Sequence, residues 1–319
     1  MWILVVLALT WDVQGGQMGY NTFGNIFFFG LGMYLCASTQ IGMFFPLSEW
    51  TAAGGEKTFV HLPEQYFQGL ALGLLVAAII PAIAAMVVGY GILGLRGHYF
   101  AICTLGLGIA AGEFAGGIEL IGAGQGMTSP PWPKGLGDTE LRGEFFYYIC
   151  FTLMICTFLF LRWAYSTRFG LVLNAIRDNE DKAESMGIDT MKYKISGWVT
   201  SAFFLGIAGG LMGNMIGYIE PVETAFPGKT FGVFMVLMAI LGGKGTLIGP
   251  VIGAIIFHIF KEGFWTFFLG WQYVALGALI VIVVVFFPEG IMGFLREKFP
   301  SKFGEVIDEK DRLSQIELK

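Results

Sequence analysis

Long apolar runs separated by short polar segments dominate the pattern along this chain. An α-helix needs about 20 apolar residues to cross the roughly 30 Å hydrocarbon core of a bilayer. Runs at or near that length cover residues 26–45, 67–93, 98–118, 145–165, 196–219 and 273–288. The pattern therefore predicts an all-α, polytopic membrane helix bundle that occupies residues 1–319 as a single transmembrane domain.

Two apolar stretches do not fit one simple span each. Residues 1–13 reach only about 20 Å at 1.5 Å per residue, so we expect a partial helix or the remainder of a span that begins upstream. The stretch 231–260 is too long for one span and is interrupted by glycines. We expect two short segments there, 231–242 and 247–262, with a hinge at Gly242, Gly243 and Gly245.

Basic residues predict the orientation of the spans. Of the 19 Lys and Arg residues, six lie in 162–194 and six in 290–319, whereas 43–66 and 119–144 are mainly acidic. Cytoplasmic loops of membrane proteins are enriched in Lys and Arg. Both basic segments, including the tail 293–319, are therefore expected in the cytoplasm. The number of crossings between them must then be even, which predicts about nine spans in total, within a range of 8–10.

Composition excludes several classes of protein. Hydrophobic residues make up 55% of the chain and charged residues 13%, against about 25% charged residues in soluble domains. The net charge of −5 argues against nucleic-acid binding. The three histidines and four cysteines are scattered through the chain, so we predict neither a metal site nor a catalytic constellation.

A few polar residues fall in or beside the predicted spans. Polar groups inside a membrane are costly, and they often mark a translocation pathway. The candidates are Asn21, Asn25, Glu113 and Asn214. The alternative is structural hydrogen bonding, and Glu113 lies near the outer end of its predicted span, where a carboxylate can face water.

The segment 166–195 differs from the other polar segments because it is long, rich in both signs of charge and amphipathic. We predict one helix over 171–187, with an apolar ridge of Ile176, Ala183 and Met186, and with Gly187 ending the helix. It is either a solvated connecting helix or a docking surface for a soluble partner.

The chain also resembles a known family in five blocks. The most specific are the Ala175–Glu180 and Ala183–Ile188 stretch and the Leu95–Leu105 stretch, which reads LRGHYFAICTL. The other blocks are Gly19–Asn25 with Phe28–Tyr34, Gly122–Met127, and Leu241–Pro250, which reads LGGKGTLIGP. In this order they resemble the permease subunit of branched-chain amino acid ABC importers, the LivM-like group. A histidine usually occupies the place of Asn25 in that group.

The resemblance implies a division of labour between chains. The expected partners are two ATP-binding subunits, a second permease chain that is a paralogue or an identical copy, and an extracytoplasmic solute-binding protein. ATP and Mg²⁺ would be bound by the partner subunits and no cofactor by this chain. In agreement, the sequence has no GxxxxGK[ST] phosphate-binding loop.

The same resemblance makes 166–195 a cytoplasmic coupling loop. The residues expected to couple it to the ATPase are Arg177, Asp178, Glu180, Glu184 and Gly187. The solute would cross a prokaryotic cell (inner) membrane by alternating access, with the helix 171–187 moving as a rigid lever. A secondary transporter or channel for a small solute is the alternative class, and urea or another amino acid or amide is the alternative substrate.

Overall fold

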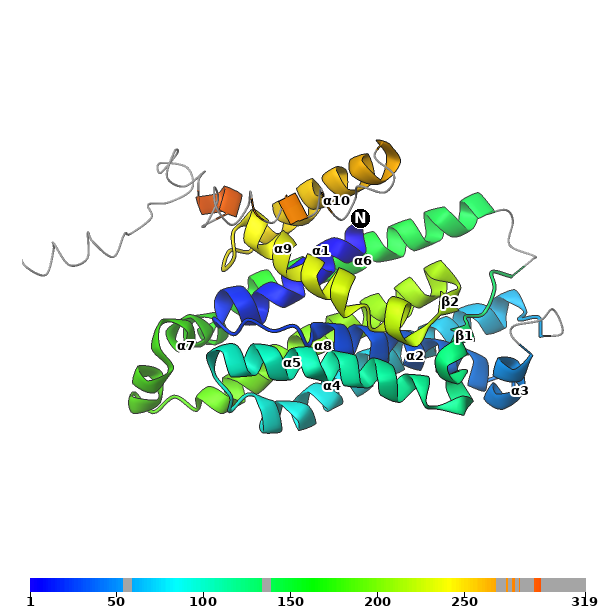
Figure 1. The fold of residues 1–319 in the computed structure, drawn as a ribbon, viewed down its shortest axis with the longest axis horizontal. Helices are drawn as coiled ribbons and strands as arrows, with labels where there is room; N and C mark the ends of the chain where they lie inside the picture. The colour runs from blue at the N-terminus through cyan, green and yellow to red at the C-terminus, as the bar shows by residue number, and fades with distance from the viewer. Residues whose placement is uncertain are drawn as a thin grey trace, which may run out of the picture.

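The computed structural model describes residues 1–53, 59–133 and 139–267, together with 274, 277–278, 281 and 290–293. Within these residues the chain is almost entirely helical (Figure 1). The helices are α1 Trp2–Asp12, α2 Asn25–Gly42, α3 Leu47–Ala52, α4 Pro63–Ile92, α5 Gly97–Gly116, α6 Thr139–Tyr165, α7 Arg168–Ser185, α8 Thr190–Ile216, α9 Val233–Gly242 and α10 Gly249–Phe267. Two short strands, β1 Met127–Thr128 and β2 Tyr218–Ile219, pair antiparallel.

Five helical segments within the described residues are long and apolar enough to cross a membrane, so the chain is a multi-pass membrane protein. They are Pro63–Ile92, Gly97–Gly116, Glu140–Tyr165, Thr190–Ile216 and Pro221–Gly242. This confirms the all-α bundle, although the total of nine spans is not confirmed. Most of the predicted span 273–288 and of the tail 293–319 lies outside the described residues.

Helices α2, α4 and α8 form the centre of the bundle through close contacts at glycines. A Cβ added at Gly206 of α8 would lie 1.8 Å from the carbonyl oxygen of Ala77 in α4. One added at Gly209 would lie 1.9 Å from that of Phe29 in α2. Small residues allow transmembrane helices to approach closely where lipid provides no hydrophobic drive between them. The central helices therefore pack backbone against backbone.

The bundle has two distinct ends. Helix α7 lies at one end, and α3 with the β1–β2 pair lies at the other (Figure 1). We call them the α7 end and the β1–β2 end. Helix α1 begins beside α6, where Trp2 packs against Phe151, and finishes near the α7 end.

The predicted break in the stretch 231–260 is confirmed. Two π-helical turns, Pro221–Ala225 and Gly228–Gly232, lead into α9. After α9 the chain reverses through Gly243 and Gly245, whose φ angles of +117° and +77° favour glycine. Helix α10 then runs back beside α9. Gly290 lies against this same turn, since a Cβ there would be 2.5 Å from the Cα of Gly243.

Candidate functional site

The amphipathic segment after α6 forms α7, but not as one continuous helix. Its first turn is capped by Thr167, whose hydroxyl accepts a hydrogen bond from the backbone N–H of Phe169. At Asn179 the backbone is extended, with φ −166° and ψ 108°, and the Asn179 side chain then accepts from the N–H of Lys182. The predicted single helix over 171–187 is therefore wrong: two helical pieces meet at Asn179, because this side chain caps a new turn.

The buried face of α7 is close to the predicted one. Leu173, Ile176 and Ala183 are buried, whereas Met186 is 83% exposed and does not belong to the predicted apolar ridge. The helix ends before Gly187, whose φ of +83° confirms its predicted role as the stop. Because the chain leaves α7 at Ser185, Met186 lies outside the helix and points away from the bundle.

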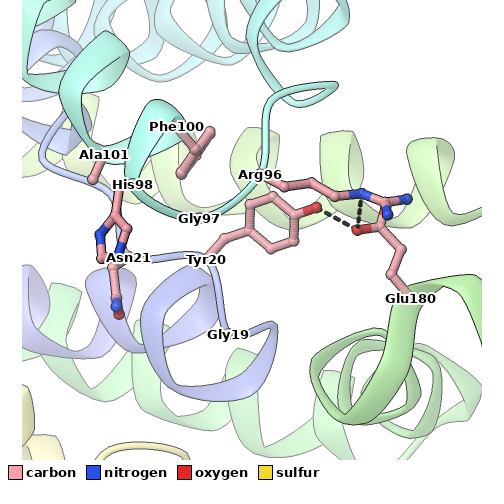
Figure 2. Close-up of a pocket in the computed structure, with 9 residues that line it drawn as sticks. All are labelled: Gly19, Tyr20, Asn21, Arg96, Gly97, His98, Phe100, Ala101 and Glu180. Carbon is pink, nitrogen blue, oxygen red and sulfur yellow. Dashed lines mark hydrogen bonds and ion pairs between the residues drawn. The ribbon is translucent and has the colours of Figure 1, made fainter.

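The Glu180 carboxylate lies at the centre of a network that joins α7 to three other segments. Lys194 Nζ of α8 lies 2.7 Å from Glu180 Oε1, and the Tyr20 hydroxyl donates to Oε2 at 2.5 Å. Arg96 Nε, just before α5, lies 3.2 Å from Oε2. Lys194 also donates to the carbonyl oxygen of Leu93, at the end of α4. Figure 2 shows Tyr20 and Arg96 converging on Glu180.

Burial makes this network strong. The side chains of Lys194 and Glu180 are only 3% and 10% exposed. Burial alone would raise the pKa of Glu180, but hydrogen bonds from Lys194 and Tyr20 and the charges of Lys194 and Arg96 outweigh it, so the pKa is lowered. The carboxylate therefore stays ionised and directed into the bundle.

A cavity of about 230 Å³ adjoins the network. Its lining includes Tyr20, Arg96 and Glu180 on one side and Asn21 and His98 on the other (Figure 2). The predicted pathway residue Asn21 therefore lies at the α7 end, beside the charged network.

A second junction joins the first piece of α7 to the glycine turn. Arg177 Nη1 donates to the carbonyl oxygen of Gly16 at 3.3 Å. The neighbouring Asp12, which is 1% exposed, accepts from the backbone N–H of Gly245 at 2.7 Å. A Cβ at Gly16 would lie 1.8 Å from Asp12 Oδ1, so only glycine fits there without displacing the carboxylate. Of the three predicted hinge glycines, Gly245 thus lies beside α7, since a Cβ there would be 3.0 Å from Arg177 Nη1.

The other predicted coupling residues lie on the outside of α7. Asp178 is exposed and pairs with Arg177 at 3.5 Å. Glu184 is exposed and accepts from the Thr190 hydroxyl at 2.6 Å, at the start of α8. The predicted group therefore divides into an inward residue, Glu180, and outward residues that a soluble partner can reach.

The structure does not bring the four predicted pathway residues together. Asn21 lines the cavity at the α7 end, and Glu113 is exposed near the end of α5. Asn25 is buried, and neither of its amide atoms has a partner among the described residues. Asn214 is buried and hydrogen-bonded: its Oδ1 accepts from Tyr66 and its Nδ2 donates to the carbonyl oxygen of Gly210.

Sequence reasoning missed three members of these junctions. Asp12 is an acid within the apolar run 1–13, and an intramembrane acid is itself a signal of a functional site. In the sequence Lys194 indicates only the orientation of the spans, although it lies at the edge of a predicted span. Nothing local to Tyr20 indicates its role, because its partner lies 160 residues away.

The fold and these junctions define a helical membrane protein with one charged helix linked to its transmembrane helices. The model of the family described as the permease component of branched-chain amino acid transport systems matches residues 1–284. The chain belongs to this family of permease components.

Curated relatives agree with the family match. The high-affinity branched-chain amino acid transport permease LivM of Salmonella typhimurium is 24% identical, over 96% of this chain and 77% of the relative. LivM of Escherichia coli K12 is 25% identical, over 94% and 76%. The E. coli K12 permease LivH is 29% identical, over 46% of this chain and 45% of its own length. No solved structure matches the chain.

Proposed function

We propose that this chain is the membrane-spanning subunit of an ATP-binding cassette importer that moves branched-chain amino acids, or a similar small polar solute, into the cytoplasm. The relatives named LivM, which cover most of this chain, support the substrate class. The α7 end would face the cytoplasm of a prokaryotic cell. The position of Gly290 against the Gly243 turn supports a cytoplasmic C-terminus, since it returns the chain to the α7 end.

The importer would contain two ATP-binding subunits, a second permease chain and an extracytoplasmic solute-binding protein. Two differently named permeases, LivM and LivH, are both similar to this chain, which supports a paralogous second permease. ATP and Mg²⁺ would be held by the ATP-binding subunits. This chain would contribute the solute path and the surface on which those subunits act.

The observation that carries the proposal is the Glu180 network. A soluble subunit that contacts Asp178 and Glu184 on the outside of α7 would move the helix. Glu180 would pass that movement to α8 and α5, through Lys194 at 2.7 Å and Arg96 at 3.2 Å. Buried ion pairs resist distortion because an unpaired buried charge is costly. The network therefore suits transmission of force between elements.

The break at Asn179 changes the proposed mechanism. In place of one rigid lever, α7 has two pieces with separate attachments. The first piece reaches the Gly242–Gly245 turn by way of Arg177 and Gly16, and the second reaches α5 and α8 through Glu180. One push on α7 would thus act on two places in the bundle, as alternating access requires.

Reconstitution in liposomes tests the proposal. The complete complex, with binding protein outside and ATP on the side of the ATP-binding subunits, is expected to accumulate leucine, isoleucine or valine only when ATP is hydrolysed. This chain with its second permease but without the ATP-binding subunits is the control, and we expect it to carry no solute. Uptake by the control at the rate of the full complex would overturn the importer and support a secondary transporter or channel.

A further inference from the structure

Two buried asparagines in the central helices differ in how their side-chain amides are hydrogen-bonded. Asn25 of α2 and Asn214 of α8 are each 1% exposed. The Asn214 amide accepts from Tyr66 and donates to the carbonyl oxygen of Gly210. Neither amide atom of Asn25 has a partner among the described residues. An unpaired polar group in the interior costs free energy, and a ligand that pairs with it removes that cost. Asn25 is therefore a candidate for binding a group from outside this chain.

The position of Asn25 directs its amide toward the beginning of α2. It is the first residue of this 18-residue helix, and the Cα–Cβ bonds of a helix tilt toward its N-terminus. The first turn of α2 contains no acidic residue, and no side chain caps it at Gly24. The N-terminus of α2 thus keeps its partial positive charge, with the Asn25 amide beside it.

Two backbone donors lie at the same place. The N–H groups of Asn25 and Ile26 have no acceptor within the residues that the structure describes. The donors on either side are used, since the N–H of Gly24 donates to the Thr22 hydroxyl and that of Phe27 donates to the carbonyl oxygen of Gly24, both at 3.0 Å. Free N–H groups at a helix N-terminus bind anions. With Nδ2 of Asn25, the beginning of α2 offers three donors to one ligand.

The loop before α2, residues 18–24, connects this place with the cavity at the α7 end. The cavity is lined by Asn21 of the loop and by Phe100 of α5 (Figure 2). One turn further along α5, the Thr104 hydroxyl accepts from the N–H of Phe23 at 3.1 Å, two residues before Asn25. This contact holds the loop against α5 between the cavity and the beginning of α2. A solute in the cavity would therefore reach Asn25 when α5 moves away from the loop.

We propose that the first turn of α2, with the Asn25 amide, binds the carboxylate group of the transported amino acid. The inference rests on the proposed function and names the chemical group that its path recognises. A carboxylate accepts hydrogen bonds only, so it matches the three donors at Asn25 and Ile26 and the positive end of α2. Access to the site depends on α7, because Arg96, immediately before α5, pairs with Glu180 at 3.2 Å. Movement of α7 would shift α5 and open the site to the cavity.

Binding of radiolabelled leucine to the purified complex, without the solute-binding protein, tests the site. Unlabelled leucine and leucinol, which lacks the carboxylate, serve as competitors. The unaltered complex should bind leucine at least about tenfold more tightly than leucinol, and Asn25→Leu should weaken leucine binding by about tenfold. Equal competition by leucinol, full leucine binding by Asn25→Leu, or no measurable leucine binding by the unaltered complex would overturn the inference.

Thermal unfolding distinguishes a binding role of Asn25 from a structural one. Without leucine, Asn25→Leu should keep or raise the unfolding temperature, because it removes an unpaired polar group. Asn214→Leu is the matched variant and should lower the unfolding temperature, because the Tyr66 hydroxyl loses its acceptor. An equal loss in both variants would overturn the inference, since Asn25 would then be bonded within the protein. ATP-dependent uptake by the unaltered complex is measured separately, so failure of this inference is distinct from failure of the proposed function.

Discussion

The two ends of the bundle are held together by different chemistry. At the α7 end, ionised side chains meet in the interior, with Lys194 and Glu180 2.7 Å apart and almost fully buried. At the β1–β2 end no buried ion pair is found among the described residues. Tyr66 donates to Asn214 at 3.2 Å, Trp50 donates to the carbonyl oxygen of Thr128 at 3.0 Å, and Arg142 donates to the carbonyl oxygen of Asn214 at 2.8 Å.

This difference distinguishes interactions that keep the bundle assembled from interactions suited to transmit the movement of α7. A neutral hydrogen bond contributes about 1 kcal/mol, and its loss is local. Breaking one side of a buried ion pair costs about 3–5 kcal/mol because the remaining charge is left unpaired. Under the proposed function, the helices at the α7 end must keep closely defined positions relative to one another. The helices at the β1–β2 end need only to stay assembled.

The largest expected effect comes from removing the buried cation. Lys194→Met leaves the Glu180 carboxylate without its nearest cation and should destabilise the protein by about 3–5 kcal/mol. Thermal unfolding of the purified complex measures this loss. The double variant Lys194→Met/Glu180→Gln removes both charges and should recover much of the stability. Equal destabilisation in the single and double variants would contradict a coupled pair.

Gly187→Val should have the next largest effect, through the backbone alone. The φ of +83° disfavours a branched side chain by about 1–2 kcal/mol, although nothing lies within 4 Å of a Cβ there. The amount of solute moved per ATP should fall, because the changed backbone at position 187 alters the angle between α7 and the segment that follows it. Gly187→Asn is the matched control, since asparagine tolerates this conformation. A loss as large in Gly187→Asn would point to side-chain size instead.

At the β1–β2 end, Tyr66→Phe should cost about 1 kcal/mol of stability, because Asn214 loses one donor. ATPase activity and solute moved per ATP should match the unaltered complex. Unfolding and transport are measured on the same preparation. A loss of coupling here would remove the distinction between the two ends.

The smallest effect is expected from Arg96→Gln. The Arg96 side chain is 51% exposed, and exposed ion pairs contribute about 0–1 kcal/mol. A stability change within this range would show that burial, and not location at the α7 end, gives the network its strength. A loss comparable to that of Lys194→Met would contradict this.

Sequence patterns predicted much of the fold because they reflect local physics. Apolar run length placed the described spans to within a few residues for most helices, and the glycines at 242–245 correctly divided the stretch 231–260. Gly187 was recognisable as a helix stop for the same local reason. The predicted span over 273–288 stays a prediction.

The candidate site was less predictable because it is assembled from distant segments. The inward direction of Glu180 depends on Tyr20 and Lys194, which lie in other elements. The break at Asn179 could not be predicted, because no glycine or proline lies beside it in the sequence. Asp12 does not stand out in the sequence because eleven of the twelve other residues in 1–13 are apolar, and its partner is a distant backbone N–H, that of Gly245.

The most direct test of the account is the ratio of solute moved to ATP hydrolysed, measured in proteoliposomes for Glu180→Gln and for Tyr66→Phe. We expect Glu180→Gln to hydrolyse ATP while moving less solute per ATP, and Tyr66→Phe to keep the ratio of the unaltered complex. An unchanged ratio in Glu180→Gln would contradict the claim that this network transmits the movement of α7.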